Sequence, residues 1–76
     1  VAKGLGSTRG KAEHLTEREL DVIRAISRGL SNKQIAHEMF ISESTVKFHI
    51  QNASKKLNSH RRAELVHRAS AAGLIT

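Results

Sequence analysis

Residues 30–57, LSNKQIAHEMFISESTVKFHIQNASKKL, are the stretch that decides the fold. They predict a short helix over 32–39, a tight turn at 40–41 and a longer helix over 43–57. An apolar stripe with helical spacing runs along the longer helix through Val46, Ile50, Ala53 and Leu57. Because such a stripe must be buried, we expect the two helices to pack against the rest of the chain as a helix-turn-helix.

One capping pattern occurs three times, at residues 15–20, 30–35 and 41–46. In each case a hydroxyl residue can cap a helix, and the apolar residues before it and four positions after it can form a hydrophobic staple. The first two copies also carry Glu19 or Gln34 at the third helical position, which completes a capping box. The pattern therefore predicts three helix starts.

Two further helices flank the central pair. The first is expected over about residues 17–28, ending at Gly29, with a core face of Leu20, Val22, Ile23 and Ile26. The last is expected from residue 61 or 62 to residue 72, after a break at 58–59. No stretch alternates convincingly with a strand period, so the sequence predicts an all-α fold, a compact four-helix domain containing a helix-turn-helix.

The length of 76 residues allows one domain. Residues 1–12 hold three glycines and no apolar period, which is typical of a linker or flexible N-terminal arm, so we assign the domain to residues 13–76. No apolar run approaches the roughly 18 residues of a membrane span, and no signal peptide is recognisable. We therefore expect a cytoplasmic protein. Because the chain begins with Val1, we also expect a domain cut from a longer protein.

The charge is unevenly distributed along the chain. Residues 13–43 hold six acids and four Lys or Arg, whereas residues 44–63 hold no acid and five basic residues: Lys47, Lys55, Lys56, Arg61 and Arg62. A stretch of one sign beside a mixed stretch suggests a polyanionic partner. Charge alone leaves open the alternative of a soluble basic surface.

The face of the longer helix that lies roughly opposite the apolar stripe carries Ser44, Lys47, Phe48, Gln51 and Lys55. Lysine donates to guanine O6 and N7, glutamine can bond an adenine edge, and an apolar side chain can contact the thymine methyl. The helix start, with the Ser44 and Thr45 hydroxyls, could hold a phosphate. A solvated face with one exposed aromatic is the alternative, but coupling to a short helix and a turn favours DNA.

The segment from Leu15 to about Leu74 resembles the helix-turn-helix domain of the LuxR/NarL family of bacterial transcription regulators. The residues that carry this resemblance are LTEREL, the run GLSNKQIA, ISESTVK followed by a histidine, KKL at the end of the longer helix, and RAEL. Because these motifs are distributed over most of the chain, the resemblance is stronger than a single short motif.

The resemblance implies a four-helix domain whose third helix reads the DNA major groove as part of a symmetric dimer. It assigns base contacts to Lys47, Phe48 and Gln51. It assigns DNA backbone contacts to Asn32, Lys33, Ser44, Thr45, Lys55 and Lys56. It places a homodimer contact in the last helix, within residues 61–72, and makes RNA polymerase a candidate partner. Many members of the family carry this domain after a phosphorylatable receiver domain, as in two-component response regulators, or after a small-ligand sensor.

Four positions depart from the family pattern. Family members often have valine at the position of Phe48 and a basic residue at that of Gln51, so the base preference of this chain is expected to differ. Ser59 stands where an apolar residue is usual, which should weaken packing between the third and fourth helices. Arg61 stands where a serine often caps the fourth helix. Because arginine is a poor cap, the helix should be about 1 kcal/mol less stable than with serine at this position.

Catalytic and metal sites are not indicated. The five histidines form no i, i+4 pair, and His49, beside the apolar stripe, is expected to be a hydrogen-bonded residue at the edge of the core. No serine stands beside a plausible His and Asp set, and there is no glycine-rich phosphate loop. We therefore expect no enzymatic activity, no cofactor, no metal and no small-molecule ligand in this domain.

Two rival interpretations remain. One is a helix-turn-helix of another kind, such as a sigma-factor-like or transposase domain, against which the capping pattern and the distributed motifs argue. The other is a helical protein-interaction module without specific DNA binding. A competition gel shift against random DNA separates this second rival from a sequence-specific DNA-binding domain.

Overall fold

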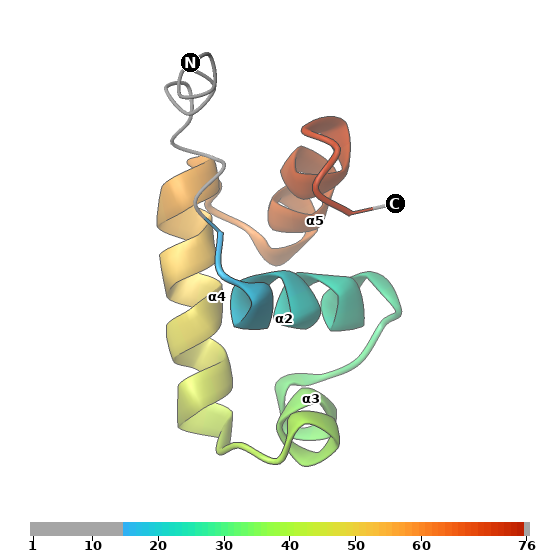
Figure 1. Ribbon diagram of the computed structural model, residues 1–76, viewed down its shortest axis with the longest axis vertical. Coiled ribbons are helices and arrows are strands. Elements are labelled where there is room, and N and C mark those ends of the chain that lie inside the picture. Colours follow the sequence, from blue (N-terminus) through green and yellow to red (C-terminus); the bar gives the residue numbers. More distant parts are fainter. Residues whose placement is uncertain (1–14, 76) are drawn as a thin grey trace, which may run out of the picture.

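The computed structural model describes residues 15–75, which form four helices and no strand (Figure 1). The helices are α2 (Glu17–Ser27), α3 (Asn32–Met39), α4 (Glu43–Leu57) and α5 (Arg62–Ala71). The expected all-α, four-helix fold is therefore confirmed, with helix bounds within about one residue of those predicted. The linker expected at residues 1–12 lies outside the described residues. None of the four helices is long and apolar enough to span a membrane.

Hydroxyl side chains begin the first three helices, as the capping pattern predicts. Thr16 and Glu19 form a reciprocal capping box, with N···O distances of 3.1 and 2.9 Å. Ser31 and Gln34 form a second box, with distances of 3.1 and 2.8 Å. Ser42 accepts the third N–H of α4 at 3.0 Å. These caps satisfy N–H groups that a helix start otherwise leaves without a partner.

The four helices share one kind of ending. Each is followed by a residue with positive φ, and the next N–H donates back to a carbonyl five positions earlier at 2.9–3.2 Å, as in the Schellman motif. The residues with positive φ are Gly29, Phe40, Asn58 and Gly73. Glycine and asparagine adopt this conformation readily, but phenylalanine does not. Phe40, at φ 59°, is therefore the exception.

α4 packs against all three other helices and stands along one side of the fold (Figure 1). Its apolar stripe is buried as predicted at Val46, Ala53 and Leu57, and is half-buried at Ile50. The centre of the core is formed by side chains that are completely buried: Val22, Ile23, Ile35, Val46 and Leu65. Leu20, expected in the core, is only half-buried at its edge, as is Met39 of α3.

An ion pair joins the start of α2 to the end of α4. The Lys56 ammonium lies 2.8 Å from the Glu19 carboxylate, whose side chain is only 4% exposed. Burial raises the pKa of the Glu19 carboxyl, but the hydrogen bonds from Lys56 and from the Thr16 N–H, together with the nearby charges of Lys56 and His49, lower it by more. The pKa therefore lies below its usual value, and the carboxylate is ionised at neutral pH.

Candidate nucleic-acid interface

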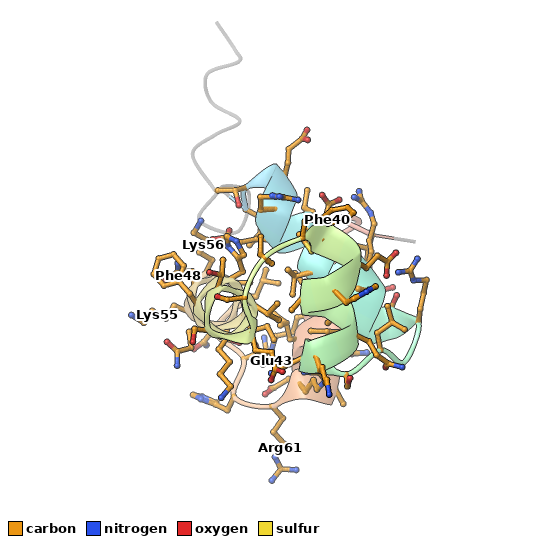
Figure 2. The ribbon with its side chains drawn as sticks, turned by 90° about the horizontal axis from the view of Figure 1, so that it is seen from below. Phe40, Glu43, Phe48, Lys55, Lys56 and Arg61 are labelled. Carbon is orange, nitrogen blue, oxygen red and sulfur yellow. The ribbon has the colours of Figure 1, made fainter. Side chains whose placement is uncertain are left out.

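The outer face of α4 presents the side chains expected to contact bases. Lys47, Phe48 and Gln51 are all exposed, as are Ser44 and Lys55 on the same helix. Phe48 is 58% exposed, which is unusual for an aromatic side chain on a helix that buries its other face. Figure 2 shows Phe48 and Lys55 pointing outward from α4, away from the other helices. The placement is that of an apolar face turned inward and a cationic, amide-bearing face turned outward.

Part of the first turn of α4 is already hydrogen-bonded to the residue that caps the helix. The Ser44 side chain is exposed, but Thr45 is half-buried and its hydroxyl lies 2.9 Å from that of Ser42. Because Ser42 also accepts the Thr45 N–H, the two hydroxyls form a local cluster at the helix start. Ser44 is thus the more accessible of the two predicted phosphate contacts.

The start of α5 is tied to the start of α3 by one guanidinium. Arg62 donates to the Asn32 side-chain carbonyl at 2.7 Å and to the Leu30 backbone carbonyl at 2.6 Å. With its oxygen bonded in this way, the Asn32 amide keeps its N–H₂ group as the donating end. Lys33, the next residue, is exposed. Sequence reasoning missed this link because no pattern relates side chains that are thirty positions apart.

A shallow groove brings several of these residues together. It is lined by Asn32 from α3, by Lys47 and Gln51 from α4, and by Arg61 and Arg62 at the start of α5. None of the described residues lining it is acidic. Two predicted base contacts thus share a surface with one predicted backbone contact. Sequence reasoning did not place Arg61 and Arg62, at the start of α5, on this surface.

The lysines that end α4 differ in their surroundings. Lys55 is exposed, whereas Lys56 is half-buried and its ammonium is bonded to Glu19 at 2.8 Å. The sequence grouped the two as equivalent backbone contacts, because it did not reveal that Glu19 would lie beside the end of α4. The structure shows that Lys56 links the end of α4 to the start of α2 through this ion pair.

His49 lies half-buried beside the apolar stripe. Its ring contacts that of Phe48, with centroids 5.9 Å apart and planes tilted by 57°, rather than forming a hydrogen bond within residues 15–75. Within the same residues, no group of three or more His, Cys, Asp or Glu side chains could hold a metal ion.

Comparison with known proteins places the chain and its fold among bacterial regulators. The model of the family described as bacterial regulatory proteins, luxR family, matches residues 13–69. A nitrate/nitrite response regulator protein homolog of Haemophilus influenzae is 60% identical over 50 residues, which cover 66% of this chain and 24% of that protein. The nitrate/nitrite response regulator NarL of Escherichia coli is 41% identical over 58 residues, covering 76% and 27%.

Solved structures agree with the sequence comparison. The response regulator ChrA of a heme-sensing two-component system is similar with a TM-score of 0.78 and 38% identity, over 80% of this chain and 30% of that one. Full-length FixJ from B. japonicum is similar with a TM-score of 0.70 and 35% identity, over 87% and 32%. The chain thus spans about a quarter to a third of the length of these relatives.

Proposed function

Because the chain belongs to the luxR family of bacterial regulatory proteins, we propose that it binds double-stranded DNA in a sequence-specific manner for transcription regulation in the cytoplasm. The observation that carries this proposal is the exposed face of α4. It combines Lys47, Phe48 and Gln51 on one surface, while the opposite stripe fills the core. An α-helix of this kind fits the major groove, where each base pair presents a distinct pattern of donors and acceptors.

Each side chain has a separate task in this proposal. Lys47 donates to guanine O6 and N7, Gln51 bonds an adenine edge, and Phe48 contacts a thymine methyl. Asn32, Lys33, Ser44 and Lys55 hold the phosphates on either side of the groove and so fix the register of α4. Thr45 and Lys56 belong to the same surface, although each already has a partner within the fold.

We propose further that two copies bind as a symmetric dimer through α5. Beside this helix lies a largely apolar depression lined by Ile26, Ala63 and Val66, together with Ser27 and Arg62. A two-fold contact uses the same patch on both copies, so one apolar patch per chain can form both sides of the contact. Two domains related in this way would read two half-sites of a symmetric operator. RNA polymerase is a candidate partner of the bound dimer.

Selection of bound sites from random duplexes tests the proposal. We expect a defined half-site, repeated with two-fold symmetry, and a competition gel shift in which random DNA fails to displace the selected duplex. A chain that retains random and selected duplexes equally would be a basic helical module rather than a sequence-specific regulator.

Two variants separate readout from positioning. Gln51→Ala should change the selected sequence, because it removes a base contact at one position, at a cost of about 1–3 kcal/mol in discrimination. Lys55→Ala should weaken selected and random duplexes to the same extent, because a phosphate contact carries no sequence information. Lys55 is the better choice than Lys56, whose replacement would also remove the ion pair with Glu19. Equal losses on both duplexes for both variants would refute the assignment of roles.

A further inference from the structure

Arg61 occupies the N-cap position of α5, where an arginine side chain does not stabilise the helix. It precedes the first residue of α5 and forms no side-chain hydrogen bond to the helix start. A serine, threonine, aspartate or asparagine at this position would cap the helix, whereas arginine has no acceptor atom with which to do so. The fold therefore gains nothing from this side chain as a cap.

No intramolecular partner explains Arg61 either. It is exposed, and it forms no hydrogen bond or ion pair with any residue in the described part of the chain. The nearest carboxylate in sequence, Glu64, accepts the His60 N–H at 2.8 Å and pairs with Arg68 at 3.1 Å. Figure 2 shows the Arg61 side chain directed away from the body of the domain, on the opposite side from Phe40.

The place of Arg61 in the fold gives it a different use. It lines the groove that also contains Lys47 and Gln51, two of the proposed base contacts. The two hydrogen bonds of Arg62 hold this end of α5 against the start of α3, so Arg61 lies beside the proposed backbone contact of Asn32. A free guanidinium at the edge of a groove without acids is suited to a phosphate, which arginine can bind through two N–H groups.

We propose that Arg61 contacts the DNA backbone, so that the start of α5 extends the phosphate-binding surface formed by α3 and α4. This inference rests on the proposed function and adds a third helix to the DNA interface. With Arg61 in place of a capping residue, α5 lacks a side-chain cap, but the edge of the proposed interface gains one cation.

The substitution Arg61→Ser tests the proposal because its two effects have opposite signs. The new hydroxyl should cap α5 and raise the melting temperature by about 4 °C, the shift expected for a typical cap in a domain of this size. The loss of a phosphate contact should weaken duplex binding about 5- to 10-fold at 0.1 M salt. It should also make the slope of log K against log salt shallower by about 0.9 for each bound domain.

Two further variants control for charge. Arg61→Gln removes the cation without supplying a good cap and should show the same loss of binding with little change in melting temperature. Arg18→Gln removes an equivalent exposed cation from α2, in the depression beside Phe40 and Met39, and should leave the slope almost unchanged. If the Arg61 variants keep the wild-type slope, or if Arg18→Gln changes it as much, the proposed contact is wrong.

The same measurements distinguish this inference from the proposed function. Each titration is made with the selected duplex and with a random duplex of equal length. A wild-type protein that does not discriminate between them contradicts sequence-specific readout, whereas the change of slope on either duplex still reports the Arg61 contact. A wild-type protein that binds neither duplex overturns both.

Discussion

Ser59, between α4 and α5, is a polar residue at a buried position where an apolar side chain would pack better. It is only 5% exposed, and its hydroxyl has no hydrogen-bond partner among residues 15–75. Its backbone N–H donates to the Ser54 carbonyl at 2.9 Å, so the position is fixed although the side chain is unsatisfied. The resemblance to the family had indicated an apolar residue here, and the burial confirms that environment.

Replacement of this serine should stabilise the domain. Ser59→Ala removes a buried hydroxyl without a partner and should raise the free energy of unfolding by about 1 kcal/mol. Urea denaturation measures the change, and Ser70→Ala, at an exposed position on α5, is the control expected to lie within about 0.5 kcal/mol of wild type. A destabilised Ser59→Ala variant would mean that the hydroxyl has a partner, such as a bound water.

Residue exposure could be predicted where it follows from helical periodicity alone. The outward positions of Lys47, Phe48 and Gln51 come directly from the stripe on the other face of their helix. The roles of Lys56 and Arg62 could not be predicted in this way, because their partners lie 37 and 30 positions away. Contacts of that kind depend on how the helices cross, which is not encoded in any local pattern.

At the scale of elements, helix starts were the most predictable feature because capping is a short-range interaction. Thr16, Ser31 and Ser42 each bond an N–H three positions ahead, so the sequence itself holds all the information. The start of α5 lacks such a cap, and its predicted position was correspondingly open between residues 61 and 62. How α2 and α4 lie relative to each other could not be predicted from the sequence, because it depends on contacts between distant residues.

The contact between α2 and α4 should make stability depend on pH. Glu19→Gln removes the charge that pairs with Lys56 and should lower the free energy of unfolding by about 1–3 kcal/mol at pH 7. Because the folded-state pKa of Glu19 lies below that of the unfolded chain, about 4.3, this contribution is present above that value. It is lost as the pH falls through the folded-state pKa.

Urea denaturation at a series of pH values from 7 to about 2 checks this expectation. The difference between wild type and Glu19→Gln should be largest near neutrality and should shrink at the acid end. Glu38→Gln, which breaks the exposed pair between Glu38 and Arg28, is the control and should have little effect at any pH. A difference that is independent of pH would show that packing, not charge, accounts for the loss.

At the scale of the whole molecule, a surface on which basic residues pair with acids is separate from a surface that carries basic residues almost without acids. Arg24 pairs with Asp21 of α2 at 3.3 Å, and Arg28 pairs with Glu38 of α3 at 2.9 Å. The cations of the groove and of the outer face of α4, by contrast, lie on surfaces whose described residues include no acid beyond the first turn of α4. Such an arrangement attracts a polyanion to one side of the molecule.

Binding should therefore weaken steeply as salt is added. If each domain neutralises about four to six phosphates, log K should fall against log salt with a slope of about −4 to −5 per domain. Fluorescence anisotropy with a labelled duplex between 50 and 300 mM salt measures this slope. A slope near −1 would not be compatible with contacts from both α3 and α4.

The turn at Phe40 has a consequence for the autonomy of the helix-turn-helix. An aromatic residue at φ 59° carries a backbone cost of about 1–3 kcal/mol, and with 93% of its surface exposed the ring recovers none of it by burial. Because neither the residue type nor its burial favours this conformation, we attribute it to the packing of the flanking helices α3 and α4, whose Ile35 and Val46 are completely buried in the core. A peptide cut from this region would lose the angle between α3 and α4, so we expect the proposed DNA-binding surface to form only when the whole domain is folded.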